Sequence, residues 1–173
     1  MSKKIARGMA ATVALVVGLA APALAQDASF VEQKGDWRVH VADNPKECWS
    51  VSEPTAWKAQ KDGKDVTVNR GKSYLFVTYR PGAGGEVSYA GGYPFAGGSN
   101  VEMNIGGTKF NLFTEGENAW AGSPDEDAKV IAAMKSGSTA VLTSRSGRGN
   151  VITDTFSLSG SSAALGGAES RYK

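Results

Sequence analysis

The chain has 173 residues, of which 41% are hydrophobic and 21% are charged, and its formal net charge is +2. This length predicts one domain and excludes a large multidomain enzyme or a repeat array, while the composition excludes wholesale disorder. The 22 glycines are roughly twice the ordinary share of ~7%, which indicates a chain with many tight turns.

The first 25 residues have the features of a secretory signal peptide. Three cationic residues precede the apolar run Met9–Ala21, and Ala23-Leu24-Ala25 fits the small-x-small cleavage pattern. We expect cleavage after Ala25 and export to the periplasm or another extracytoplasmic compartment. Residues 26–173 are then expected to form a single β-rich domain without a transmembrane segment.

Removal of this segment changes the charge of the protein. Residues 26–173 carry 16 cationic and 17 acidic side chains, a net charge of −1. Because binding to nucleic acids depends on neutralising phosphates, this near-neutral chain is not expected to bind them. Cys48 is the only cysteine, so no disulfide can form within the chain, and we expect this thiol to be buried.

Alternation of apolar and polar residues with a period of two predicts a series of short strands. The predicted strands cover residues 36–41, 48–51, 65–69, 73–80, 86–90, 101–105, 108–114, 139–145 and 150–158. The run 73–80 is apolar on both faces in its middle, which predicts a central strand covered on both sides. Gly106-Gly107 can supply the positive φ angles of a hairpin turn between 101–105 and 108–114.

One segment departs from the period of two. Ser123-Pro124-Asp125-Glu126 has the pattern of a capping box with proline at the first helical position. Apolar residues then follow at helical spacing, which predicts an amphipathic helix over about 124–136. A helical turn around 163–165 is also expected. The fold class is therefore all-β, an antiparallel sandwich or barrel with one short helix and a helical turn near the C-terminus.

Candidate catalytic groups are few. His40 is the only histidine, and with Cys48 eight residues away it could form a thiol–imidazole pair. No set of soft ligands with metal-binding spacing accompanies them, so we expect no metal, no cofactor and no catalytic residues. Asp154 lies in a strand-like run between two threonines, where it is expected to accept hydrogen bonds from neighbouring backbone or hydroxyl groups.

An aromatic and glycine-rich segment is the candidate binding region. It contains Tyr89, Tyr93 and Phe95, with Gly91-Gly92 between them. Aromatic side chains close to loops can anchor a partner. The same side chains could instead fill the open end of a sandwich or barrel, and the sequence leaves both interpretations open.

Several segments in order resemble the bacterial invasion-associated locus B family. They are Gly35-Asp36-Trp37-Arg38-Val39, Cys48-Trp49-Ser50-Val51-Ser52-Glu53-Pro54, Leu75-Phe76-Val77-Thr78-Tyr79-Arg80-Pro81, and residues 149–160 followed by Ala163-Ala164-Leu165. The resemblance spans nearly all of residues 26–173. It implies an exported, mainly β protein of the cell envelope and, in pathogenic relatives, a link to host-cell invasion. Many members of that family look as if they contain paired cysteines, whereas this chain has His40 where one such cysteine would stand and keeps only Cys48.

The leading functional hypothesis is a non-enzymatic envelope protein that binds another envelope protein or a surface polymer through loops on a rigid β scaffold. The first alternative is a small periplasmic hydrolase or thiol enzyme that uses His40 and Cys48. The second is a structural or chaperone-like component of the envelope.

Overall fold

The computed structural model describes residues 28–172, so the expected signal peptide lies outside the described residues. The strands are β1 (Ser29–Lys34), β2 (Trp37–Asp43), β3 (Lys46–Ser52), β4 (Ala56–Lys61), β5 (Lys64–Asp65), β6 (Tyr74–Tyr79), β7 (Glu86–Ala90), β8 (Asn100–Ile105), β9 (Thr108–Glu115), β10 (Asn118–Trp120), β11 (Thr139–Arg145) and β12 (Val151–Ser157). The helices are α1 (Pro124–Ser136) and α2 (Ser161–Ser170). An antiparallel, mainly β fold with a helix at 124–136 is therefore confirmed.

All twelve strands belong to one open sheet, in the order β1-β2-β3-β6-β7-β10-β9-β8-β11-β12-β4-β5. The sheet curls so that the inner faces of its two halves meet. The Tyr89 ring on β7 meets the Phe156 ring on β12 edge to face, with 6.2 Å between the ring centroids, although four strands separate β7 from β12 in the sheet order. The indole nitrogen of Trp37 likewise donates to the Ser157 carbonyl oxygen at 3.0 Å. This curl creates the sandwich-like core.

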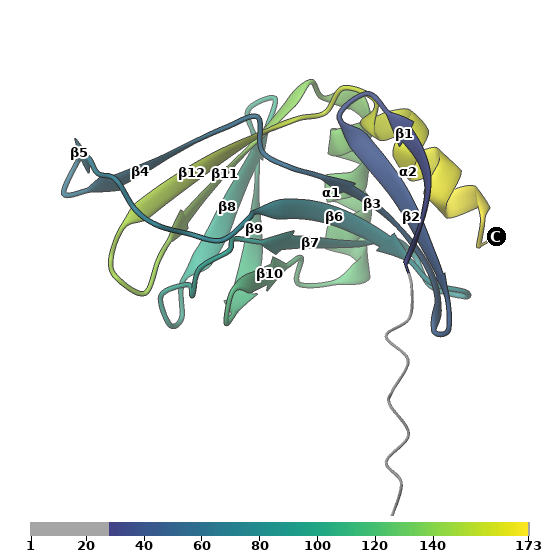
Figure 1. Ribbon diagram of the computed structural model, residues 1–173, viewed down its shortest axis with the longest axis horizontal. Helices are drawn as coiled ribbons and strands as arrows, with labels where there is room; N and C mark the ends of the chain where they lie inside the picture. The colour runs from purple at the N-terminus through teal and green to yellow at the C-terminus, as the bar shows by residue number, and fades with distance from the viewer. Residues whose placement is uncertain (1–27, 173) are drawn as a thin grey trace, which may run out of the picture.

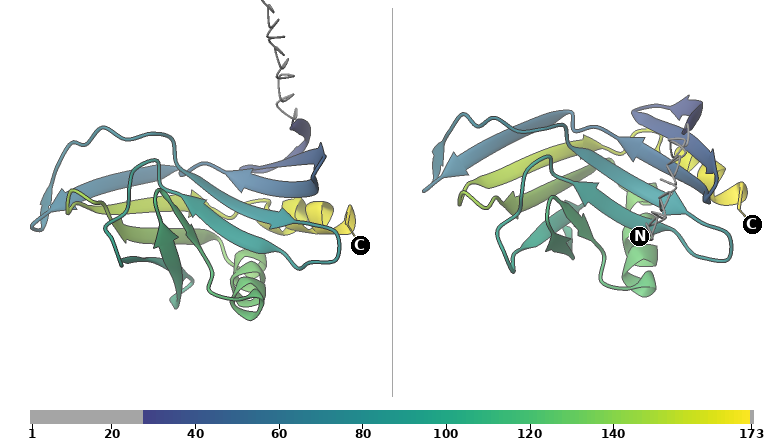
Figure 2. Two further views of the ribbon diagram at one scale, coloured as in Figure 1. Left: turned by 90° about the horizontal axis from the view of Figure 1, so that it is seen from below. Right: turned by 60° about the horizontal axis from the view of Figure 1, so that its bottom comes forward.

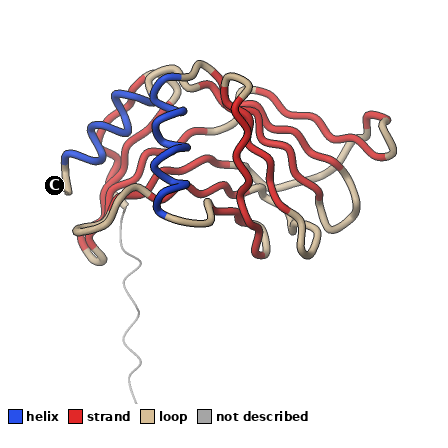
Figure 3. Tube along the Cα trace, turned by 180° about the vertical axis from the view of Figure 1, so that it is seen from behind, coloured by secondary structure: helices blue, strands red, loops and turns tan. Residues whose placement is uncertain are grey.

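Both helices lie against the part of the sheet formed by β1, β2, β3, β6 and β7. Helix α2 packs on β1, β2, β3 and β6, and α1 packs on α2 and β7 (Figure 3). In Figure 1 and in both views of Figure 2 the β4–β5 hairpin projects at the end of the molecule away from the C-terminal helix α2. That end of the curled sheet is therefore left without a helix.

Helix α1 follows the pattern that its sequence predicts. The Ser123 hydroxyl accepts from the Glu126 amide at 3.3 Å, and the Glu126 carboxylate accepts from the Gly122 amide at 2.9 Å. Asp127, Val130, Ile131 and Met134 form its buried side. The expected C-terminal turn around 163–165 is part of the ten-residue helix α2.

Two strand predictions need correction. Residues 65–69 were expected to form a strand, but β5 ends at Asp65, because residues 66–73 leave the sheet and cross toward β6 (Figure 1). The run 73–80 was expected to be covered on both faces. In β6, however, Leu75, Val77 and Tyr79 are buried while the alternate residues are partly exposed, because the helices cover only one face of this half.

Candidate functional site

A buried polar cluster around Asp154 links the two halves of the sheet. The Asp154 side chain on β12 is fully buried, and its two oxygens accept from the two terminal nitrogens of Arg70 at 2.8 and 2.6 Å. They also accept from the Ser73 hydroxyl at 3.1 Å and from the Tyr89 hydroxyl. Four donors therefore meet the carboxylate, three at Oδ2 and one at Oδ1, and a buried charge needs such partners to be tolerated.

The Arg70 guanidinium lies between two aromatic rings. Its central carbon is 4.4 Å from the Trp57 ring centroid and 5.9 Å from that of Tyr93, and the side chain is only 6% exposed. Burial by itself lowers the pKa of Arg70, but the hydrogen bonds and charge of Asp154 raise it above its usual value. The guanidinium is therefore a permanent cation fixed in one orientation.

Two tyrosines complete the cluster. Burial raises the pKa of Tyr89, and the nearby Tyr93 and Asp154 raise it further, so its hydroxyl stays protonated and donates to the carboxylate. Burial also raises the pKa of Tyr93, whose hydroxyl oxygen lies 2.6 Å from the hydroxyl oxygen of Ser144 on β11. The cluster thus joins β7, β11 and β12 with residues 70–73.

A cleft of about 750 Å³ opens directly beside this cluster. One wall is the segment 66–71, here called the strap, which connects β5 to β6. The other walls are residues 92–94 and the turn between β11 and β12. The lining residues are Val66, Thr67, Val68, Asn69, Arg70, Gly71, Gly92, Tyr93, Pro94, Glu117, Ser146, Gly147, Arg148, Asn150 and Ile152.

Polar groups make up much of the lining of this cleft. Asn69, Asn150, Thr67 and Ser146 offer neutral hydrogen-bonding groups, and Arg148 offers a charge. The lining contains no histidine or cysteine, and Glu117 is its one carboxylate. Two other hollows, of about 310 and 450 Å³, are smaller.

The aromatic residues singled out from the sequence lie mainly in the core. Tyr89 is 1% exposed, and Tyr93 and Phe95 are each 8% exposed. Their rings contact one another, with centroids 5.9 Å apart for Tyr89–Phe95 and 5.3 Å for Tyr93–Phe95. The absence of a side chain at Gly91 makes room, since a Cβ there would lie 2.8 Å from the Phe95 ring. Of the three, Tyr93 alone lines the cleft, and a binding role for the segment stays a prediction.

His40 and Cys48 do not form a thiol–imidazole pair. In the β2–β3 register His40 faces Trp49, on which it stacks at 5.7 Å, whereas Cys48 faces Val41. Since side chains alternate between the faces of a sheet, the imidazole and the thiol lie on opposite faces. Cys48 is buried, and burial raises its pKa. This is the inert form of a cysteine, as the sequence led us to expect.

Sequence reasoning missed the cation at the centre of the site. Asp154 was expected to accept hydrogen bonds, and it does so from two hydroxyl groups, but its main partner Arg70 lies 84 residues away in the chain. Arg70, Ser73 and Ser144 carried no pattern that distinguished them. The one usable signal was an aspartate inside an otherwise strand-like run, since a buried carboxylate requires a cation or several donors.

Two further observations concern metal ligands and helix length in the part of the chain that the structure describes. No group of three or more His, Cys, Asp or Glu side chains within 28–172 is arranged to hold a metal ion. Neither described helix has the length and apolar character needed to cross a membrane.

Comparisons with known proteins give a family and a fold. The sequence model of the family described as "Invasion associated locus B (IalB) protein" matches residues 39–169. The crystal structure of invasion associated protein B from Bartonella henselae is similar to the chain with a TM-score of 0.56 and 14% sequence identity, over 81% of this chain and 96% of that chain. At this identity the structural similarity shows the fold alone. No curated protein matches the chain.

Proposed function

Because the chain belongs to the invasion associated locus B family, we propose that it is an exported, non-enzymatic envelope protein that captures a partner in the cleft. The partner is an envelope protein or a surface polymer. The observation that carries the proposal is the cleft of about 750 Å³, whose lining includes Arg70 and Tyr93 of the Asp154 cluster. Lining residues that are already held in place lower the entropic cost of ordering the site when a partner binds.

The alternatives identified from the sequence have weaker support. A thiol enzyme needs its imidazole and thiol within hydrogen-bond reach, but His40 and Cys48 lie on opposite faces of the sheet. A purely structural role would leave unexplained the polar lining of the cleft, to which Asn69, Asn150 and Arg148 contribute.

Filling the cleft tests the proposal. Gly147 lines the cleft, and a Cβ there would lie at ordinary contact distance, 3.6 Å from the Pro94 carbonyl oxygen. The variant Gly147→Trp should therefore occupy the cleft without disturbing the backbone. Gly97→Trp is the matched control, because Gly97 faces open space outside the cleft.

The measurement is in-cell cross-linking of the exported protein, followed by identification of the captured partner. We expect Gly147→Trp to lose the partner and Gly97→Trp to keep it, with unchanged circular dichroism for both. Equal capture by the two variants would remove the cleft from the proposal. Export is tested separately, by fractionation and N-terminal sequencing, with Gln26 as the expected first residue.

A further inference from the structure

We propose that the cleft takes an extended, uncharged peptide segment of an envelope protein, which pairs as a strand with Thr67 and Asn69 of the strap. This inference rests on the proposed function and names the chemistry of the partner. It is carried by the direction in which the strap presents its unpaired backbone groups and by the balance of charge in the cleft lining.

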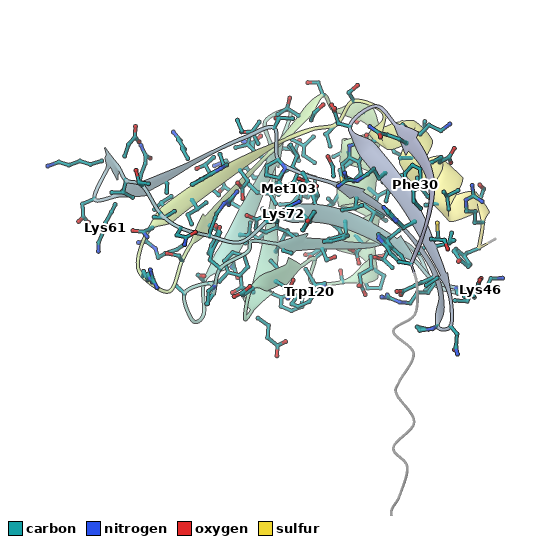
Figure 4. The ribbon with its side chains drawn as sticks, viewed as in Figure 1. Phe30, Lys46, Lys61, Lys72, Met103 and Trp120 are labelled. Carbon is teal, nitrogen blue, oxygen red and sulfur yellow. The ribbon has the colours of Figure 1, made fainter. Side chains whose placement is uncertain are left out.

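The strap crosses the molecule as an extended chain. Figure 4 shows Lys61 at the projecting β4–β5 end and Lys72 near the middle of the molecule, and the strap connects these two places. Residues 67–69 contain no turn or bend. Within residues 28–172 they belong to no strand and make no backbone hydrogen bond. Their N–H and C=O groups are therefore available to a binding partner.

Two hydrogen bonds hold the ends of the strap. The Val66 amide donates to the Ala59 carbonyl oxygen on β4 at 2.9 Å, and the Gly71 amide donates to the Gly92 carbonyl oxygen at 2.8 Å. In an extended chain the N–H and C=O groups of one residue point to the same edge, and those of the next residue point to the opposite edge. Because Val66 and Gly71 are an odd number of residues apart, the first points toward β4 and the second toward the other edge of the strap.

Thr67 and Asn69 present their backbone groups to the cleft. Both are an even number of residues before Gly71, so they share its edge and point toward Gly92 on the facing wall of the cleft. They offer two donors and two acceptors at the spacing of alternate strand residues, ~6.6 Å. An extended peptide carries the complementary groups at this spacing and can pair with them. The backbone of a polysaccharide carries no such series of N–H and C=O groups.

The charges of the cleft lining balance one another. Asp154 neutralises Arg70, and apart from Arg70 the described residues of the lining include one cation, Arg148, and one carboxylate, Glu117. An acidic or a basic segment would be attracted by one of these side chains and repelled by the other, and its charges would also lose hydration. The lining therefore favours an uncharged segment. Its apolar part can receive the peptide side chains that face it, and consists of Val66, Val68, Tyr93, Pro94 and Ile152.

The probe is an end-blocked octapeptide of alternating Thr and Val that carries an uncharged dye, and its binding to the exported protein is followed by fluorescence anisotropy. We expect saturable binding that added salt leaves unchanged. Peptides in which Glu or Lys replaces Thr should both bind more weakly, and tighter binding of either would overturn an uncharged occupant. Gly147→Trp, which fills the cleft, should abolish binding of the probe, whereas Gly97→Trp should keep it.

Proline substitutions in the strap test which edge pairs with the probe. Thr67→Pro removes an N–H that points into the cleft, whereas Val68→Pro removes one that points away from it. Neither amide has a backbone partner within residues 28–172, so circular dichroism should show both variants folded. We expect Thr67→Pro to weaken binding about fivefold, as the loss of about one hydrogen bond implies. Val68→Pro, and Thr67→Val, which keeps the amide, should bind normally.

Each result bears on a different proposal. Equal affinities of Thr67→Pro and Val68→Pro would overturn strand pairing, and displacement of the probe by the neutral oligosaccharide maltoheptaose would overturn a peptide occupant in favour of a surface polymer. Absence of peptide binding while Gly147→Trp still abolishes partner capture would overturn the inference and leave the proposed function standing. Partner capture that survives in Gly147→Trp would overturn the proposed function itself.

Discussion

Asp154 shows how one residue can set the stability of this protein. Its carboxylate is fully buried, so the cost of removing it from water must be offset by its donors. Arg70, Ser73 and Tyr89 supply them. Removing the carboxylate leaves the Arg70 guanidinium, which is 6% exposed, without a counter-charge. A buried cation without a partner is among the most destabilising defects in a folded protein.

We therefore expect Asp154→Ala to lower the free energy of unfolding by about 3–5 kcal/mol. The control is Glu53→Ala, which breaks the ion pair with Arg38, whose side chains are 41% and 42% exposed; the expected loss is about 0–1 kcal/mol. Urea denaturation followed by circular dichroism measures both. Similar losses for the two variants would show that the cluster is not the main polar support of the fold.

A second prediction about a single residue concerns the pKa of His40. Burial, and then the positive charge of Arg38, lower the pKa of His40 below its ordinary value of 6.5. Because the folded state disfavours the charged imidazole, the stabilisation from this residue is complete above pH 6.5 and is lost as the pH falls through the folded-state pKa. His40 is the only histidine, so nuclear magnetic resonance can follow its titration without overlap.

We expect a measured pKa below 6.5 for His40. The variant Arg38→Gln should raise this pKa, because it removes the positive charge of Arg38. Lys129→Gln, which removes a distant exposed charge, should leave the pKa of His40 unchanged. The stability of the unmodified protein should fall relative to His40→Gln as the pH is lowered from 7 to 5. A pKa at or above the ordinary value would contradict the packing of this ring against Trp49 and Phe30.

Between elements, a tight backbone junction joins the β1–β2 turn to the start of α2. Gly160 precedes α2 with a φ of +84°, and a Cβ there would overlap the Lys34 carbonyl oxygen. The Asp36 amide donates to the Ser159 carbonyl oxygen at 3.1 Å across the same junction. This contact places α2 over β2 and β3, so a side chain at Gly160 should push the helix away from the sheet.

We expect Gly160→Ala to lower the free energy of unfolding by about 3 kcal/mol or more, since it combines an unfavourable φ with a backbone clash. Gly149→Ala is the matched control, because Gly149 has a φ of +82° but open space around it; the cost of φ alone is about 1–2 kcal/mol. Thermal denaturation compares them. Equal losses of unfolding free energy for the two variants would show that the backbone around Gly160 moves to accept a Cβ without a further energetic cost.

Local sequence signals predicted some elements well and others poorly. Helix α1 was found because its cap, its proline and its apolar spacing all lie within residues 123–136. The 101–105 and 108–114 hairpin was found because Gly106 and Gly107 have the positive φ angles that its turn requires. Strand β4 was missed, because Ala56–Lys61 is exposed along most of its length and acquires its strand partner only from β12.

At the scale of the whole molecule, the curl of the sheet determines whether its two halves unfold together or separately. Phe156 on β12 is fully buried and meets Tyr89 on β7, so the two halves of the sheet share one core. A shared core predicts that the halves unfold together. The fluorescence of Trp37, Trp49, Trp57 and Trp120 samples β2, β3, β4 and β10.

We expect urea transitions measured by tryptophan fluorescence and by far-ultraviolet circular dichroism to coincide. By both measurements, Phe156→Ala should lower the free energy of unfolding by about 3–5 kcal/mol. Phe113→Ala, at a side chain that is 48% exposed, should lower it far less. Two separate transitions in the unmodified protein would mean that each half of the sheet is stable without the other.

The sequence alone determined the features of the protein that depend on residues close together in the chain. It predicted the antiparallel β class, the helix at 124–136, the buried Cys48 and the family resemblance, because alternation, caps and turn glycines act within a few residues. The tertiary structure decided the rest. Only the curl of the sheet brings Asp154 to Arg70, buries Tyr89, Tyr93 and Phe95, and opens a cleft beside them. The Asp154–Arg70 contact joins residues 84 positions apart, and hydrophobic periodicity carries no information about which distant polar groups will meet.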